Sequence, residues 1–540
     1  MKLQFMKRIF FTKSLCYSYI EQVYSKGDLR CLRLQLWRTK RKGSAKVWIT
    51  NEKGGRKVKK QALNPYLPQN EYIPDGEPYV FGDRVYVYGS HDRFNFPIFC
   101  VNDYVCYSAP VDDLSDWRYE GVIYRKNQDP RNRLGLRLLF APDVAVGCDG
   151  RYYLYYAFDF MGIMGVAVSD TPAGPYEFYG HVHYKDGIIW GRRKGDSFPF
   201  DPGVLVDDDG SVYLYSGFYT PVPAAATGFH KLKNEGGYVL ELESDMVTVK
   251  TPEKLLFPKE GKGAFSNHEF FEASSIRKYE GKYYFVYSSR HNHGLCYAVS
   301  NSPTEGFVYR GTLVSNADIF LDQGMSEKEA KNYIGNTHGG MLRIKDQYYI
   351  FYHRQTNRNS YSRQACAEKL ERDEKGDFLQ AEMTSCGLND GPLKGEGVYE
   401  ARIACNLWSK EGTGRYDVGN PKKLLKNHPY ITQDKRDGDP SARQYIANMR
   451  DGAVAGFKYF EITGPTDITV WLSGNGKGEI EVSDTLDFSR SVHIPVEVNS
   501  ENIESFHALF SGVYGARALY FKYSGEGSMN FFRFGLQPEV

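Results

Sequence analysis

The sequence predicts an all-β protein in which a five-bladed β-propeller is followed by an antiparallel β-sandwich. Three observations lead to this prediction: a high content of aromatic residues and glycine, five copies of one hairpin pattern, and a run of short alternating strands near the C-terminus. Aromatic residues make up 15% of the 540 residues, and 54 residues are glycine. Tyr and Phe favour strands, whereas Gly supplies the positive φ angles of tight turns.

A polar turn followed by an alternating aromatic strand occurs five times. The copies are GDRVYVYGS, DGRYYLYYA, DGSVYLYSG, EGKYYFVYS and KDQYYIFYH, and their central tyrosines are 60 to 71 residues apart. Each copy is typical of the second arm of a β-hairpin. Units of this length with three or four short strands predict a propeller, because a large sandwich would not repeat at this period.

The strand before each turn opens with a polar residue that is followed by Gly, Ala or Ser. These positions lie 10 to 12 residues before the central Tyr and are occupied by Asp75, Asp143, Asp201, Glu272 and His338. Equivalent positions in radially repeated blades face one another across the axis, so we expect one ring of polar side chains. A single acid here could instead cap a turn, but four acids and a histidine at one register favour a functional site.

Two carboxyl groups across a cleft suit glycoside hydrolysis. One is kept protonated and donates a proton to the leaving oxygen, while the other is ionised and activates water. A third carboxylate nearby raises the pKa of the acid by like-charge repulsion. Blades that face each other across an axis favour the inverting geometry, in which the two carboxyls lie roughly 6.5–9.5 Å apart.

The ordered motifs IPDGEPYVF, FAPDVAVG, FDPGVLVD, FFEASSIRK and GNTHGGMLRI resemble glycoside hydrolase family 43 over roughly residues 61–390. This resemblance implies a five-bladed propeller enzyme that acts on β-xylosides, α-L-arabinofuranosides or, in some members, galactosides. It implies that Asp75 is the general base, Asp201 modulates the pKa of the acid, and Glu272 is the general acid.

Other positions follow from the same resemblance. It implies that Asp143 lines the site and that His338 helps to hold a bound cation or its waters, which allows a structural Ca²⁺ near His338. No cofactor is required for the chemistry. The first motif contains PDGEP, which introduces Glu77 as a further candidate substrate contact.

Three residues outside the motifs are candidates for substrate binding, each with a structural alternative. Phe94, after GSHDR, could wall the pocket. Trp190, between the second and third copies, could stack on a sugar ring or be buried in a loop core. Arg354, in FYHR, could hold a sugar hydroxyl or orient Glu272, and it could equally be a surface arginine.

We expect four segments: a basic N-terminal extension over 1–60, the propeller over 61–390, a crossover over 391–429 and a sandwich over 430–540, which could be similar to carbohydrate-binding modules. The extension carries a net charge of +14 and the remainder −12. The extension has neither aromatic interleaving nor an amphipathic period, so no nucleic-acid or membrane partner is expected. No signal peptide is evident, which predicts a cytoplasmic location; the oligomeric state stays open.

The favoured function is an inverting, exo-acting hydrolase of β-xylosides or α-L-arabinofuranosides in short plant-derived oligosaccharides. The alternative is a non-catalytic glycan-binding propeller, which loss of one catalytic carboxylate would favour. A retaining fructosidase-like propeller is a third interpretation, but its NDPNG and RDP motifs are absent from the sequence.

Overall fold

The computed structural model describes residues 60–261, 265–319, 321, 325–414 and 426–539, together with two short strands nearer the N-terminus. The chain divides into two units, Met1–Lys59 and Lys60–Val540. In the first unit, β1 (Gln35–Leu36) pairs antiparallel with β2 (Val47–Trp48). The predicted basic extension otherwise lies outside the described residues. The propeller and the C-terminal sheet both belong to the second unit.

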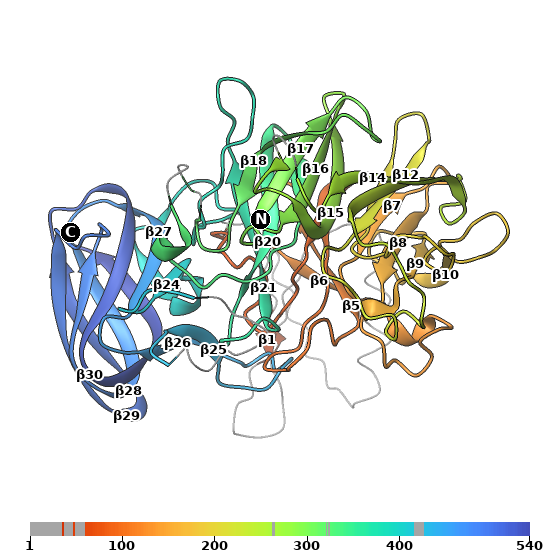
Figure 1. Cartoon of the computed structure of the whole chain (residues 1–540). Helices are drawn as coiled ribbons and strands as arrows, with labels where there is room; N and C mark the ends of the chain where they lie inside the picture. Colours follow the sequence, from red (N-terminus) through yellow and green to blue (C-terminus); the bar gives the residue numbers. More distant parts are fainter. Residues whose placement is uncertain are drawn as a thin grey trace, which may run out of the picture. The chain divides into compact units, whose positions relative to one another are not determined.

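Five antiparallel sheets follow one another along the second unit and confirm the predicted five-bladed propeller (Figure 1). The first four sheets each have four strands in chain order. Blade one consists of β3 (Glu77–Phe81), β4 (Arg84–Tyr88), β5 (Tyr104–Pro110) and β6 (Arg118–Tyr124). Blade two consists of β7 (Asp143–Val146), β8 (Tyr152–Ala157), β9 (Met164–Ser169) and β10 (Glu177–His181). Blade three consists of β11 (Gly203–Val206), β12 (Val212–Gly217), β13 (Gly236–Leu242) and β14 (Val249–Pro258).

The last two blades complete the ring. Blade four consists of β15 (Phe270–Tyr279), β16 (Lys282–Ser289), β17 (Leu295–Ser300) and β18 (Val308–Val314), and blade five has three strands, β19 (Met341–Ile344), β20 (Gln347–Gln355) and β21 (Arg363–Leu370). Asn64, from the start of the propeller segment, borders β21: its side-chain Oδ1 accepts from the Ala367 amide, and its Nδ2 donates to the Ala367 carbonyl. One asparagine side chain therefore takes the place of a strand neighbour and joins the two ends of the ring.

The repeated aromatic strands are the second strands of the blades, and both of their faces are buried. In β8, Tyr153 and Tyr155 pack in a core shared with blade three, whereas Leu154 and Tyr156 pack in a core shared with blade one. Successive side chains of a strand point to opposite faces, so a strand between two neighbouring blades needs apolar residues at every position. This requirement explains the runs of Tyr, Leu, Val and Phe.

The small residues predicted near the axis allow close approach between blades. A Cβ atom on Gly203 would lie 2.7 Å from the carbonyl oxygen of Ser274, and one on Gly340 would lie 2.3 Å from a carboxylate oxygen of Glu77. Both contacts are too short for any side chain. The innermost strands of blades three and four, and of blades five and one, therefore pack through glycine.

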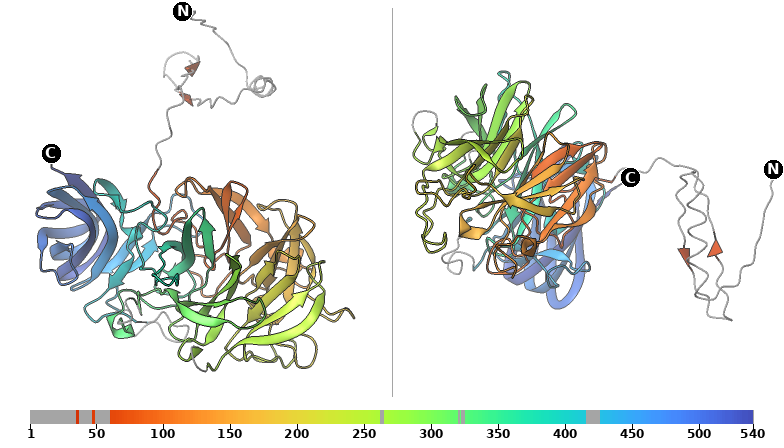
Figure 2. Two further views of the ribbon diagram at one scale, coloured as in Figure 1. Left: turned by 90° about the horizontal axis from the view of Figure 1, so that it is seen from above. Right: turned by 90° about the vertical axis from the view of Figure 1, so that its right-hand side faces the viewer.

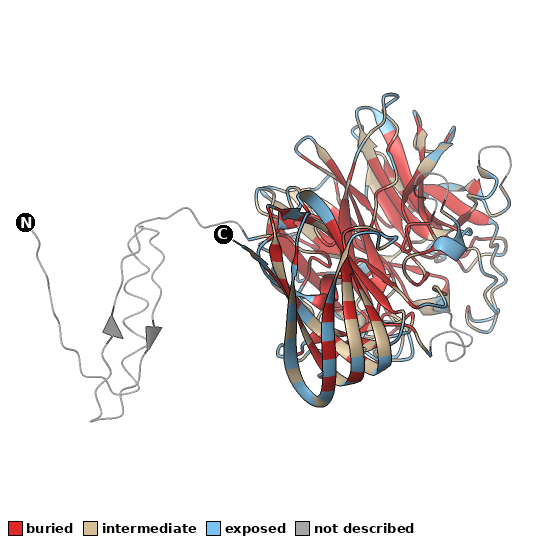
Figure 3. Ribbon diagram, turned by 90° about the vertical axis from the view of Figure 1, so that its left-hand side faces the viewer, coloured by how far each residue is buried: buried red, intermediate tan, exposed pale blue. Residues whose placement is uncertain are grey.

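The C-terminal region is rich in strands, as predicted for a sandwich (Figures 2 and 3). Its main strands are β25 (Tyr430–Gln433), β26 (Gln444–Met449), β27 (Val454–Ile462), β28 (Thr466–Ser483), β29 (Ser491–Phe510) and β30 (Gly515–Pro538). Buried and exposed residues alternate along β28 and β29, so one side of these strands faces the core and the other faces solvent (Figure 3).

The prediction of a simple crossover over 391–429 was wrong for its first half. This stretch contributes β22 (Leu393–Lys394), β23 (Gly397–Glu400) and β24 (Asn406–Trp408), which pair with β27 and β30. Its apolar residues, among them Leu393 and Leu407, belong to the C-terminal core. Short strands separated by polar turns lack a clear alternation, which is why the sequence pattern did not reveal them.

The helical segments that the structure describes in full are single turns of 3₁₀ helix: Lys126–Gln128, Asp159–Met161, Glu327–Glu329 and Ala401–Ile403. Within the described residues, no helix combines the length and the apolar character needed to cross a membrane.

Candidate active site

The ring of polar residues forms at the ends of the innermost strands. Asp75 and Asp201 lie two residues before the first strands of blades one and three, and Glu272 lies within β15 of blade four. Asp75 and Asp201 have φ angles of 59° and 43°, and Ala273 follows Glu272 with a φ of 68°. Left-handed backbone is unfavourable for residues with a side chain and is concentrated at functional sites. The three carboxyls act on one another, because the negative charges of Asp201 and Asp75 both raise the pKa of Glu272.

Asp75 is held as a carboxylate by a buried arginine. Arg363 Nη1 donates to Asp75 Oδ1 over 2.8 Å, and the remaining guanidinium donors bind Asp92. His353 Nδ1 lies 3.2 Å from the same carboxylate oxygen. Burial by itself would raise the pKa of Asp75, but Arg363 and His353 together lower it well below its ordinary value. Asp75 is therefore ionised at neutral pH, as a general base must be.

Glu272 has the opposite environment. Its side chain keeps partial exposure to solvent. Burial of the carboxyl, followed by the negative charge of Asp201, raises the pKa of Glu272 to about 8. The side chain is therefore protonated at neutral pH, as a general acid must be. Asp75 and Glu272 are two carboxyl groups in one site whose environments separate their pKa values, which is how one fold supplies an acid and a base.

Asp201 lies between Glu272 and His338. Its Oδ2 accepts a hydrogen bond of 3.1 Å from the Ala273 amide, next to Glu272, and lies 3.4 Å from His338 Nδ1. Burial raises the pKa of Asp201, and His338 opposes that change. Burial would lower the pKa of His338, but Asp201 and then Asp75 raise it to about 9. Asp201 and His338 therefore form an ion pair beside Glu272.

The predicted roles of Glu77 and Asp143 in substrate binding were wrong. Both side chains are fully buried. Glu77 Oε2 accepts from Arg277 Nη2 at 2.6 Å and from Ser275 at 3.0 Å. Asp143 accepts a hydrogen bond of 2.6 Å from the Tyr79 hydroxyl and one of 2.7 Å from the backbone amide of Val204 in blade three. These carboxylates fasten neighbouring blades together and leave no surface for a sugar.

The neighbourhood of His338 is a poor fit to calcium. Ca²⁺ takes six to eight oxygen ligands. Among the described residues there is no group of three or more His, Cys, Asp or Glu side chains placed to hold a metal ion. His338 Nε2 and Glu77 Oε1 lie 4.0 Å apart, and neither atom has a hydrogen-bond partner within the described part of the chain. The guanidinium of Arg277, however, already binds the other oxygen of Glu77. The local charges suit a protonated imidazole, and the acid–base chemistry of the three carboxyls does not depend on a cation.

Three further predicted residues have distinct surroundings. Phe94 is partly exposed in the loop after β4, where its ring stacks on Tyr72 with centroids 5.4 Å apart and its amide donates to Asp437. Trp190 is buried, and its indole donates to Glu253 at 2.8 Å. The prediction that Trp190 is a stacking platform was therefore wrong, and the alternative of burial in a loop core is confirmed.

Arg354 is not at the site either. Its side chain is buried and donates to the carbonyl oxygens of Ala404 and Arg402 and to Gln364. These contacts join blade five to the segment between β23 and β24 of the C-terminal sheet. The side chain next to it in β20, His353, points to Asp75 instead, because alternate residues of a strand face opposite sides.

The sequence reasoning missed Arg363, Asp92 and His353. Asp92 is fully buried and accepts three donors of Arg363, two from its guanidinium and one from its backbone amide. Because Arg363 and Asp92 are 271 residues apart, no local pattern joins them. The signal in the sequence was the alternation of side-chain direction along β20, which puts His353 and Arg354 on opposite faces of the strand and leaves His353 on the face toward Asp75.

Comparisons with known proteins show to which family the chain belongs. The model of Glycosyl hydrolases family 43 matches residues 64–378. A protein of Thermoclostridium stercorarium named xylosidase/arabinosidase is 49% identical over 483 residues, which cover 89% of this chain and 99% of that protein. An arabinoxylan arabinofuranohydrolase of Paenibacillus polymyxa is 25% identical over 87% of this chain and 72% of its own length.

Solved structures are also similar. A family 43 arabinoxylan arabinofuranohydrolase from Bacillus subtilis, solved in complex with cellotetraose, aligns with a TM-score of 0.47 and 21% identity over 88% of this chain and 97% of that one. The family match spans the five blades and every carboxyl of the ring. This chain therefore belongs to glycosyl hydrolases family 43.

Proposed function

We propose that this protein is an inverting, exo-acting glycoside hydrolase that removes β-xylosyl or α-L-arabinofuranosyl units from short plant-derived oligosaccharides. The observation that carries the proposal is the separation of the two carboxyl pKa values: Arg363 keeps Asp75 ionised, while burial and Asp201 keep Glu272 protonated. The names of the relatives support the sugar class, because the one at 49% identity is called a xylosidase/arabinosidase.

The chemistry follows from these protonation states. Glu272 donates its proton to the glycosidic oxygen as the bond to the anomeric carbon breaks. Asp75 takes a proton from a water molecule on the opposite face of the sugar, and the oxygen of that water bonds to the anomeric carbon with inversion. Asp201 keeps Glu272 protonated before the reaction, and its ion pair with His338 holds its own charge in place.

Short substrates are consistent with the location that the sequence predicts. A cytoplasmic enzyme would meet imported oligosaccharides rather than polymer, and short chains suit removal of one terminal sugar at a time. The non-catalytic alternative gains no support, because all three proposed catalytic carboxyls are present and their pKa values differ in the direction that catalysis needs.

A panel of nitrophenyl glycosides tests the proposal. The purified protein should hydrolyse the β-D-xyloside or the α-L-arabinofuranoside and leave the β-D-galactoside largely intact. Glu272→Gln, assayed in parallel, controls for a contaminating glycosidase. A wild-type protein that hydrolyses no pentoside, or that prefers the galactoside, would contradict the proposed sugar class.

A further inference from the structure

Four loops of blades two and three lie at the end of the propeller where the carboxyl ring forms. They join β6 to β7 (125–142), β8 to β9 (158–163), β10 to β11 (182–202) and β12 to β13 (218–235). Gly203 at the start of β11 pairs with Tyr215 near the end of β12, so β11 begins where β12 ends, next to Asp201. Blade two has the same arrangement. The four loops therefore border the proposed active site.

These loops are basic. Together they contain eleven Lys and Arg against six Asp and Glu, a net charge of +5, whereas residues 61–540 as a whole carry −12. Six of the cations, which we call the basic rim, form no ion pair with a carboxylate in the described part of the chain: Arg131, Arg133, Arg192, Lys194, Lys231 and Lys233. Arg192 is partly exposed, and the other five are exposed.

Contacts between the loops make the rim one continuous surface. Arg192 donates to the backbone carbonyls of Met161 and Gly162, in the loop after β8. The Phe198 amide donates to the Lys233 carbonyl over 2.9 Å, which joins the loop after β10 to the loop after β12.

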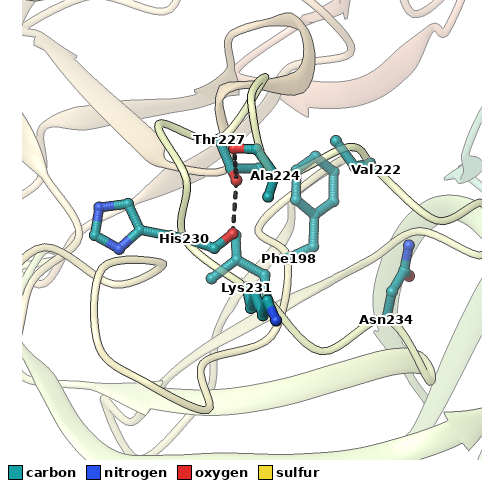
Figure 4. A pocket seen from close by; sticks show the side chains of 8 residues that line it. Phe198, Val222, Ala224, Thr227, His230, Lys231 and Asn234 are labelled. Carbon is teal, nitrogen blue, oxygen red and sulfur yellow. Dashed lines mark hydrogen bonds between the residues drawn. The ribbon is translucent and has the colours of Figure 1, made fainter.

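A cavity of about 290 Å³ lies beside the loop after β12 (Figure 4). Lys231 and His230 line it together with apolar and neutral polar side chains, and none of the residues that line it is an Asp or Glu. This hollow part of the rim therefore offers an anion a positive charge and no competing carboxylate.

The rim reaches the carboxyl ring through aromatic side chains. Phe160 adjoins Met161, whose carbonyl binds Arg192. The Phe160 ring stacks on Phe200 with an interplanar angle of 11° and centroids 6.1 Å apart, and Phe200 directly precedes Asp201. Arg192 is thus connected to the catalytic carboxyls by a short chain of contacts.

The guanidinium of Arg192 is held in place and keeps one edge free. It donates from Nη1 to the Gly162 and Gly191 carbonyls over 2.9 and 2.7 Å, and from Nη2 to the Met161 carbonyl over 3.1 Å. Of its five N–H groups, the one on Nε and one on Nη2 remain. Nε and Nη2 are adjacent along one edge of the guanidinium, so together they match the two oxygens of a carboxylate.

The charge of Arg192 has no carboxylate of its own. Asp196, whose charge acts on Arg192, is buried and already accepts hydrogen bonds from the amides of Gly191, Arg192 and Arg193. Burial lowers the pKa of Arg192, and the positive charge of Arg131 lowers it further. Two positive charges held close together are unfavourable, and an anion from outside would offset their repulsion.

We propose that Arg192 binds the carboxylate of a uronic acid on the substrate, with Arg131 as the second positive charge of this site, and that the rest of the basic rim attracts acidic oligosaccharides. The inference rests on the proposed function and names its substrate class: xylo-oligosaccharides that carry a glucuronic acid branch, taken in preference to neutral ones. Because the rim borders the place where the sugar chain is cut, an acidic branch of the substrate is favoured over a membrane or a nucleic acid as its partner.

The test compares kcat/KM for xylotetraose with kcat/KM for xylotetraose that carries one glucuronic acid. Two branched forms, with the acid on the second or on the third sugar from the non-reducing end, are measured, and the faster one is used. The acidic substrate should have a kcat/KM at least about tenfold higher at low salt, because hydrogen bonds between charged groups are stronger than neutral ones. About 0.5 M NaCl should reduce this ratio at least about threefold, since salt screens exposed charges.

Arg192→Gln should lower the ratio of acidic to neutral kcat/KM at least about fivefold, because glutamine lacks both the charge and the fork. Arg131→Gln, at an exposed side chain, should lower it at least about threefold and decides the matter if Arg192→Gln fails to fold. Arg125→Gln is the matched control, because Arg125 is exposed in the same loop as Arg131 but already binds Asp103 at 3.4 Å. The control should leave the ratio within about twofold of wild type.

A smaller preference of the wild type for the acidic substrate overturns the proposal, as does a high ratio that a folded Arg192→Gln protein retains. Binding of the wild type to vesicles of phosphatidylserine and phosphatidylcholine, together with equal kcat/KM values for the two substrates, would assign the rim to a membrane surface instead. For an enzyme that prefers arabinofuranosides, both substrates carry a terminal arabinosyl unit. Failure to hydrolyse any neutral pentoside contradicts the proposed function, whereas equal hydrolysis of both substrates contradicts only the acidic substrate class, so the two failures are distinguishable.

Discussion

Replacement of Asp201 by Asn should move the alkaline limb of the pH profile to lower pH. After burial, the negative charge of Asp201 is the largest cause of the raised pKa of Glu272. Asparagine has the same shape as aspartate, and its side-chain oxygen can still accept the 3.1 Å hydrogen bond from the Ala273 amide. The substitution therefore removes a charge with little change in packing.

The size of the effect follows from the structure. The pKa of Glu272 is raised from 4.5 to about 8, and each unit corresponds to about 1.4 kcal/mol, so the environment favours the protonated acid by about 5 kcal/mol. The negative charge of Asp201 supplies part of this free energy. Its removal also lowers the pKa of His338, whose positive charge opposes Asp201 at Glu272. Because these two changes partly cancel, we expect a net displacement of the limb by about 1 to 2 pH units.

The assay is kcat/KM on a nitrophenyl pentoside from about pH 5 to about pH 10, because this parameter reports the ionisation of free enzyme. Since the protonated acid is the active form, activity is lost as the pH rises through its pKa. Wild type should lose activity near pH 8, and Asp201→Asn about 1 to 2 units lower. Asp208→Asn, in the exposed turn of the same blade, is the matched control. A limb that stays in place, or moves upward, in Asp201→Asn would refute the role of this charge.

Three further substitutions separate acid, base and structural roles. Glu272→Gln should reduce the rate of oligosaccharide hydrolysis by about 10²–10⁴-fold and the rate of glycosyl fluoride hydrolysis far less, since fluoride leaves without a proton. Equal losses of rate on the two substrates would contradict the acid role. Arg363→Lys should lower kcat at least about tenfold and move the acidic limb of the pH profile to higher pH, because one amine cannot bind Asp75 and Asp92 together as the guanidinium does; an acidic limb at the wild-type pH would contradict this role of Arg363. Trp190→Phe should lower the free energy of unfolding by about 1–3 kcal/mol, because the buried Glu253 loses the indole donor and keeps only its hydrogen bonds from Ser197, and KM should not change; a raised KM would restore a binding role.

The blades could be predicted because their determinants are local. A polar turn followed by alternating aromatic residues describes a hairpin within about ten residues, and five such hairpins at one period define a propeller. Counting back from the central tyrosines also located Asp75, Asp201 and Glu272, since equivalent positions of radially arranged blades meet at the axis.

The remaining parts of the site depend on contacts between distant segments. Arg363 binds Asp75 across 288 residues, and Trp190 donates to Glu253 across 63 residues. The sequence predicts Glu77 as a substrate contact, but in the structure Glu77 binds Arg277, which is 200 residues away in the sequence. Whether a charged side chain serves a substrate or joins two blades is decided by such partners, and no short motif contains them.

Proton NMR of the first product formed from a β-D-xyloside, or from an α-L-arabinofuranoside, tests the assignment of base and acid in one experiment. If Asp75 activates a water on the face opposite Glu272, the anomer of inverted configuration appears first, α-xylose from the β-xyloside, before mutarotation equilibrates the sugars. Release of the retained anomer as the first product would mean that a carboxylate attacks the sugar directly, and Asp75 and Glu272 could then not be the base and the acid of a single inverting displacement.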